Sequence, residues 1–195
     1  MSDIELIKSL NSTGKGFFTP ADLEKVTGLE RASLYVALNR WVRKGLLERA
    51  AHGVYVVSGQ AAQPEVIAQQ LYFPCYLSFE SALSRHGVLN LVPYSLTFAT
   101  AKKTKATEVL GQSVNYRHIM DGLFFGFAMA GGLYVAEAEK ALLDLVYLDA
   151  FGKAQLPLEE IDARWLSLPR LREYASRFPR RVTKALEVLV DRAGA

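Results

Sequence analysis

Three hydrogen-bonding side chains, Asn39, Arg40 and Arg43, lie within five residues of one another in a segment with helical periodicity. Arginine donates paired hydrogen bonds to guanine, and asparagine pairs in a similar way with adenine. At about 100° per residue, these side chains share one face of a helix. The same face or its edges carry Ala32, Ser33, Tyr35 and Val36. These side chains therefore predict recognition of base edges in a DNA groove.

Two helix signals place this face. Thr19 and Pro20 predict the start of a short helix over 21–26, because a hydroxyl caps a helix well and proline is tolerated in its first turn. Gly28 fits the end of that helix, where a positive φ is common. A second, longer helix then runs from about Arg31 to Lys44. This spacing predicts a helix-turn-helix.

The opposite face of the second helix carries an apolar stripe, Leu34, Leu38, Trp41 and Val42, which we expect to face the core. After Gly45, the segments 46–49 and 54–57 predict two short strands around a tight turn at His52 and Gly53. Such a hairpin is the wing of a winged helix-turn-helix, and it would present Arg49 and His52 to phosphates.

The predicted contacts with double-stranded DNA follow from this arrangement. A winged helix also serves in some proteins as a protein–protein adaptor, and this alternative stays open. DNA binding is favoured because the predicted exposed face is polar and basic. The predicted DNA-binding residues are Arg31, Ser33, Tyr35, Val36, Asn39, Arg40, Arg43, Arg49 and His52.

The rest of the chain predicts a second domain. Residues 58–64 are small and polar and end in a proline, which predicts a linker between domains over 1–60 and 64–195. The fold class is therefore α+β, with an amino-terminal winged helix-turn-helix and a mixed α/β carboxy-terminal domain. Helices are expected at 4–10, 64–71, 78–85, 137–148, 158–163, 168–178 and 180–192, and strands at 94–99, 114–119, 124–128 and 133–136.

Composition narrows the class of protein. Half of the 195 residues are hydrophobic, which is enough for a substantial core. The single cysteine, Cys75, excludes an internal disulfide and any cysteine-based zinc site. The first five residues are acidic rather than basic, and no run approaches the roughly 18 apolar residues of a membrane span. We therefore expect a cytoplasmic protein without a signal peptide or a membrane anchor.

Two patterns could suggest catalysis. Ser78, Glu80 and His86 contain a nucleophile, an acid and a base, but Ser78 fits a helix cap better and His86 lies two turns away. Glu139 and Lys140, with Asp121 upstream, have the spacing of a metal-dependent nuclease. We interpret them instead as residues that open a helix and pair along it.

The histidines are scattered over the chain. We therefore predict no enzymatic activity, no metal and no cofactor, and a metal-dependent nuclease remains the alternative.

A basic segment lies near the carboxy terminus. The net charge of the whole chain is only +3, yet residues 170–184 carry six basic side chains and one acid, Glu173. Solubility and pairing with nearby acids would explain this charge, and so would an anionic partner such as DNA, RNA or an acidic protein. The predicted partner-binding residues are Arg170, Arg172, Arg177, Arg180, Arg181 and Lys184.

Several ordered segments resemble a known family. These are residues 76–87, 97–100, 124–126 and 138–144, which resemble the second domain of AbiEi-type antitoxins. An amino-terminal winged helix stands in the expected place, so the resemblance covers nearly the whole chain. It implies a repressor of its own promoter that also counters a toxin similar to a nucleotidyltransferase in a phage-defence toxin–antitoxin pair. Direct contact with the toxin stays open, and the implied DNA contacts lie on the 31–43 helix.

Overall fold

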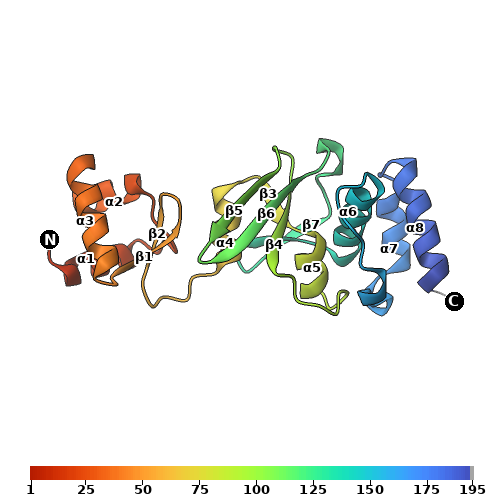
Figure 1. Ribbon diagram of the computed structural model, residues 1–195, viewed down its shortest axis with the longest axis horizontal. Coiled ribbons are helices and arrows are strands. Elements are labelled where there is room, and N and C mark those ends of the chain that lie inside the picture. Colours follow the sequence, from red (N-terminus) through yellow and green to blue (C-terminus); the bar gives the residue numbers. More distant parts are fainter. Residues whose placement is uncertain (194–195) are drawn as a thin grey trace. The chain divides into compact units, whose positions relative to one another are not determined.

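The computed structural model describes residues 1–193 and divides into two compact units (Figure 1). The amino-terminal unit comprises Met1–Ile67 together with Glu108–Gly111. The carboxy-terminal unit comprises Ala68–Thr107 and Gln112–Ala195, and its last two residues lie outside the described part of the chain. The fold is a mixture of helices and sheets, so the predicted α+β class is confirmed.

The amino-terminal unit is a winged helix-turn-helix. Its elements are α1 (Asp3–Ser12), α2 (Pro20–Thr27), α3 (Arg31–Arg43), β1 (Leu47–Ala51) and β2 (Val54–Val57). The two strands pair antiparallel and form the wing. The helix-turn-helix and the hairpin therefore fall where the sequence predicts them, although β1 begins and ends slightly later than expected.

Helix α2 begins with a capping box. The Thr19 hydroxyl accepts a hydrogen bond from the Asp22 backbone N–H, and the Asp22 carboxylate accepts one from the Thr19 N–H at 2.9 Å. Partial burial acts to raise the pKa of Asp22, but hydrogen bonds from Lys15 and Thr19 outweigh it and lower the pKa to about 2. Gly28 ends the helix with a φ of 68°, as a left-handed cap requires. These local signals set the turn between α2 and α3.

Helix α3 packs one face against the core of the unit. Leu34, Ala37, Leu38 and Trp41 are buried, whereas Val42 is 36% exposed. The prediction that Val42 faces the core is therefore wrong, and Ala37 takes its place. The buried cluster also includes residues of α1, α2 and the wing, among them Leu6, Leu10, Leu23 and Leu47.

The carboxy-terminal unit is built on a six-stranded mixed sheet with the order β5-β6-β4-β3-β8-β7. Strand β3 pairs antiparallel with β4 and parallel with β8, so it lies inside the sheet. The strands are β3 (Cys75–Leu77), β4 (Ser95–Thr100), β5 (Lys105–Val109), β6 (Gln112–His118), β7 (Phe127–Ala130) and β8 (Leu133–Ala136).

The sequence prediction missed two strands of this sheet and misplaced the start of a third. Strands β3 and β5 were not predicted, because three residues are too few to show alternation and β5 carries exposed charges on its outer side. The strand expected at 124–128 begins only at Phe127, because a 3-10 turn, Asp121–Leu123, precedes it.

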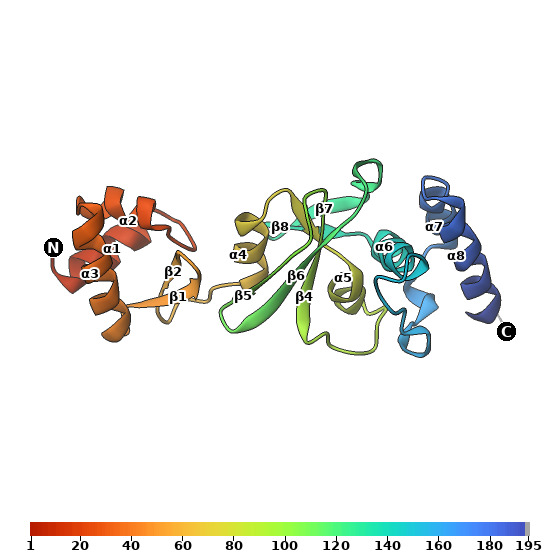
Figure 2. The same ribbon diagram turned by 45° about the horizontal axis from the view of Figure 1, so that its top comes forward.

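Helices cover both faces of this sheet (Figure 2). On one face, the Tyr116 hydroxyl of β6 donates to the Ala68 carbonyl of α4 (Pro64–Leu71) at 2.6 Å. On the other face, the Thr97 hydroxyl of β4 donates to the Ser78 carbonyl, at the start of α5 (Phe79–Arg85), at 2.8 Å. Tyr116 pairs in register with Phe98, the neighbour of Thr97 on β4, so the two contacts lie on opposite faces of the sheet.

Helix α6 (Ala138–Ala150) packs against α5 and against the last two helices, α7 (Leu168–Ala175) and α8 (Arg180–Ala193). This position buries ten consecutive residues of α6, from Glu139 to Leu148. The helix predicted at 158–163 is instead two separate 3-10 turns, Leu158–Glu160 and Ala163–Trp165. Among the described residues, no helix has both the length and the apolar character needed to cross a membrane.

The capping box of α2 generates a stability prediction. Replacing Thr19 by alanine removes the side-chain acceptor for the Asp22 N–H, and we expect the free energy of unfolding to fall by about 1 kcal/mol. Urea denaturation followed by circular dichroism measures this change. The exposed Ser33, which is inside α3 rather than at a cap, serves as the control, and Ser33→Ala should change the stability little. Equal effects of the two substitutions would contradict the role of the cap.

Candidate nucleic-acid interface

All nine side chains predicted to contact DNA are exposed in the amino-terminal unit. Seven of them lie on α3, six of these opposite its buried stripe or at the edges of that face, whereas Arg31, the first residue of the helix, lies at its flank. Arg49 and His52 belong to the wing, at β1 and at the following turn. The structure therefore presents these groups to solvent on the two elements that a winged helix uses for DNA.

The arginines on the exposed face of α3 have few internal partners. The Nε atom of Arg43 donates a hydrogen bond to the Asn39 carbonyl at 3.3 Å, which holds the arginine along the helix. Within the described part of the chain, neither Arg40 nor Arg43 forms an ion pair with a carboxylate. Their guanidinium groups are thus available to an external acceptor.

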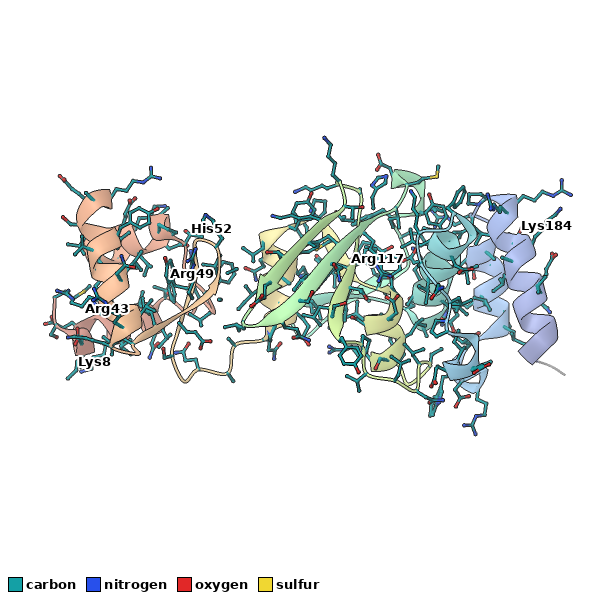
Figure 3. All side chains as sticks on the ribbon, viewed as in Figure 1. Lys8, Arg43, Arg49, His52, Arg117 and Lys184 are labelled. Atoms are coloured by element: carbon teal, nitrogen blue, oxygen red, sulfur yellow. The ribbon has the colours of Figure 1, made fainter. Side chains whose placement is uncertain are left out.

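The wing has an internal contact that orders its basic side chains. The Nη2 atom of Arg49 lies 3.1 Å from Nδ1 of His52 (Figure 3). A guanidinium only donates hydrogen bonds, so this contact is a hydrogen bond in the histidine tautomer whose Nδ1 accepts. This arrangement leaves other donors of Arg49 free for phosphate oxygens.

The basic segment near the carboxy terminus falls on α7, α8 and the turn between them, and its six basic side chains are exposed. Three of the six also have structural contacts. Arg170 lies 3.6 Å from the carboxylate of Glu137, and the Arg177 guanidinium lies 3.6 Å from the centre of the Phe125 ring. Arg181 lies over Phe151 at 5.4 Å.

The other three are Arg172, Arg180 and Lys184. Among the described side chains, none of them forms an ion pair or lies over an aromatic ring. The Lys184 side chain extends away from the helices (Figure 3). We call these three residues the free basic set, because they can be changed without loss of a contact that the structure records.

A buried polar cluster lies in the interior of the carboxy-terminal unit. Lys140 forms an ion pair with Asp144 one turn later on α6, and both side chains are fully buried. The Lys140 ammonium also donates to the Tyr76 hydroxyl at 2.8 Å. Tyr76 and Ser78 donate in turn to the Asp144 carboxylate at 2.9 and 2.8 Å. Every member of the cluster therefore has hydrogen-bond partners.

Burial and ion pairing shift the pKa values of Lys140 and Asp144 in opposite directions. Burial lowers the pKa of Lys140 and raises the pKa of Asp144, and each residue partly offsets the shift of the other. Burial also raises the pKa of Tyr76 well above its usual value. The aromatic rings of Phe125 and Phe178 lie 5.1 and 5.3 Å from the Lys140 ammonium. The lysine side chain thus has no solvent-exposed surface and lies among aromatic rings and the Tyr76 hydroxyl.

Two sequence interpretations change as a result. Ser78 stands at the start of α5, but its hydroxyl forms no cap and bonds to Asp144 instead. Lys140 does pair along its helix, yet it does so in the interior rather than on the surface. Sequence analysis missed Asp144 and Tyr76, although the i, i+4 spacing of Lys140 and Asp144 on a predicted helix was a usable signal.

The residues of the two candidate catalytic patterns are engaged elsewhere. Glu80 binds Arg117 at 2.8 Å, and His86 Nε2 lies 2.8 Å from the Ala136 carbonyl oxygen, so neither reaches Ser78. Glu139 is 3% exposed and accepts the Ser167 N–H at 2.7 Å. The nuclease interpretation therefore loses the two residues on which it depended.

Metal binding and thiol chemistry have little support in this unit. In the part of the chain that the structure describes, no three His, Cys, Asp or Glu side chains are grouped as a metal site. Cys75 is buried in β3, and burial raises the pKa of its thiol to about 12. At neutral pH this thiol is therefore protonated and shielded.

Residues 5–58 match the model of a family described as a transcriptional regulator, AbiEi antitoxin. The matched segment is therefore similar to the AbiEi antitoxin family. It spans the winged helix-turn-helix from α1 to the end of the wing, and the resemblance inferred from the sequence is thereby confirmed. A comparison with curated proteins found no match.

The AbiEi match indicates a broad function for the chain. Proteins of this family are antitoxins that regulate transcription.

The buried pair generates a second stability prediction. Lys140→Met would leave the Asp144 carboxylate buried without a cation, and we expect the free energy of unfolding to fall by about 3–5 kcal/mol. The double variant Lys140→Met with Asp144→Leu removes both charges, so it should regain a large part of that loss. Urea unfolding measures both, with the exposed Lys153→Met as control. A single variant as stable as the unchanged protein would rule out the proposed importance of the pair.

Proposed function

We propose that the protein is a sequence-specific DNA-binding repressor of its own promoter, and that it also acts as the antitoxin to a toxin similar to a nucleotidyltransferase. The observation that carries the repressor half is the exposed face of α3, where Asn39, Arg40 and Arg43 are free of carboxylate partners among the described residues. The antitoxin half follows the match to the AbiEi family. Acting on a promoter would place the protein in the cytoplasm.

In this proposal α3 enters the major groove. Its polar side chains hydrogen-bond to base edges, which supplies the sequence preference. The wing lies beside the DNA backbone, where Arg49 and His52 contact phosphates and fix the register of the helix. The two elements share one hydrophobic core, because Leu34 and Trp41 of α3 pack in the same cluster as Leu47 of β1. This common core supports a rigid placement of helix and wing.

The antitoxin activity is assigned to the carboxy-terminal domain. Its surface at α7 and α8 concentrates positive charge, and the free basic set lacks recorded internal partners among the described side chains. Such a surface suits an anionic partner, either an acidic face of the toxin or the nucleic acid on which the toxin acts. The division of labour between residues 1–60 and 64–195 is part of the proposal.

An adaptor that binds only protein is the second candidate for the winged helix. Tyr35 and Val36 are 43 and 72% exposed on α3, and exposed apolar groups are common in protein interfaces. The same face nevertheless carries the polar or basic side chains of Asn39, Arg40 and Arg43. DNA binding therefore accounts for more of the face than protein binding does.

Promoter binding tests the repressor half. We expect the purified protein to shift DNA carrying its own promoter, and the variant Arg40→Ala with Arg43→Ala to bind at least about tenfold more weakly. Each base-reading arginine contributes about 1–3 kcal/mol of discrimination. The control is Arg85→Ala with Lys153→Ala, which removes the same charge from exposed sites of the other unit. Equal affinity of the two double variants would contradict the assigned recognition face.

A single wing variant adds a second readout. Arg49→Ala should weaken binding by a similar factor on promoter and unrelated DNA, because a phosphate contact carries no sequence information. The slope of log affinity against log salt concentration should also become smaller by about one unit. Loss of sequence preference in this variant would instead place Arg49 against a base.

Growth rescue tests the antitoxin half. Cells that express the cognate toxin should be rescued by the unchanged protein, and rescue should be weaker when Arg172, Arg180 and Lys184 are all replaced by glutamate. The control replaces Arg85, Lys103 and Lys153 by glutamate, which makes the same change of charge at exposed positions elsewhere in the unit. Urea unfolding of both variants, followed by circular dichroism, shows that each is folded. Full rescue by the first variant would mean that these charges serve solubility alone.

A further inference from the structure

The exposed face of α3 has an apolar side chain near its centre. Val36 is 72% exposed and, at about 100° per residue, lies opposite the buried Leu34 and Leu38 side of the helix. Its neighbours one turn away include Asn39 and Arg40, which are polar. Valine has a lower helix propensity than alanine or the long polar residues, and this one contributes no burial to the core. The stability of the winged helix therefore gives no reason for a valine here.

The major groove offers one kind of apolar group. Each base pair presents hydrogen-bond donors and acceptors there, and thymine alone adds a methyl group, at C5. The two methyl groups of valine cannot hydrogen-bond, so they leave donors and acceptors of other base pairs unsatisfied. When the valine methyl groups pack against a thymine methyl group, both apolar surfaces are removed from water, and this burial is favourable. The chemistry of Val36 thus selects among the four bases.

We infer that Val36 reads the 5-methyl group of a thymine in the DNA site. This inference rests on the proposed function, in which α3 enters the major groove. Asn39 lies three residues further along and its Cβ atom is about 5–6 Å away, which is within reach of a neighbouring base pair. Since asparagine pairs with adenine, the two side chains together select a short stretch of A·T pairs. Arg40 and Arg43 then select guanine beside it.

The same helix contains a matched control. Val42 is also exposed, at 36%, but it lies at the flank of α3 near the core side rather than near the centre of the outer face. Val36→Ala and Val42→Ala remove the same two carbon atoms from the same helix. Alanine has a higher helix propensity than valine, so both variants should fold. Any difference in DNA affinity between the two variants can then be attributed to the position of the valine on the helix.

The experiment removes the methyl group from the DNA as well as from the protein. The promoter fragment is amplified once with dTTP and once with dUTP, which deletes every 5-methyl group and keeps the hydrogen-bonding pattern. Affinities of the full chain and of both valine variants are measured on the two fragments at one salt concentration. For the unchanged protein we expect about fourfold weaker binding to the uracil fragment for each thymine methyl contacted, from the value of one buried methylene.

The two variants should separate clearly. Val36→Ala should bind the thymine fragment several-fold more weakly and lose little more on the uracil fragment, because its methyl contact is already gone. Val42→Ala should keep the full sensitivity of the unchanged protein. Uracil substitution also alters the shape of DNA, but this change is the same for all three proteins and cancels in the comparison.

Three results would overturn the inference. Equal affinity of the unchanged protein for both fragments would show that no thymine methyl is read, while DNA binding itself would stand. A Val36→Ala variant with undiminished sensitivity to uracil would show that another residue reads the methyl group. No binding to either fragment would overturn the proposed function and this inference with it.

Discussion

The buried ion pair between Lys140 and Asp144 holds the carboxy-terminal unit together at one point. An ion pair in a protein interior is tolerated only when its remaining hydrogen-bonding capacity is filled, and here Tyr76 and Ser78 fill it. These residues come from the central strand β3, the start of α5 and helix α6, so the pair fixes three elements relative to one another. Gly126 is part of the same constraint. A Cβ atom there would lie 3.0–3.2 Å from the Lys140 side chain, and its φ of 70° already favours glycine.

Local chemistry explains why the amino-terminal unit could be predicted so closely. Thr19 and Gly28 act within a few residues of themselves, through a cap and a positive φ, and the apolar stripe of α3 has the period of a helix. Sequence reasoning misplaced only the flank of that stripe, at Val42. In the other unit, β3 is three residues long and its partners lie more than twenty residues away along the chain. Pairings of that kind leave no periodic trace in a sequence.

In the predicted site, too, features that depend on local sequence could be predicted, whereas contacts between distant residues could not. That Arg40 and Arg43 lie on an outer face follows from helix geometry alone, whereas the contacts of Arg170, Arg177 and Arg181 with distant side chains required the fold. The segments on which the family resemblance was based, 76–87 and 138–144, prove to supply the buried cluster. The family match itself falls on residues 5–58. The two lines of evidence are thus carried by different parts of the chain.

The state of Cys75 has a practical consequence for optical experiments. It is the single cysteine of the chain, it lies in the interior of the sheet, and its thiol stays protonated at neutral pH. Maleimide dyes react with exposed thiolates, so they should leave this residue untouched in the folded protein. A cysteine introduced at an exposed position would therefore take up one fluorophore per molecule. The natural cysteine need not be removed first, and the packing of β3 would stay intact.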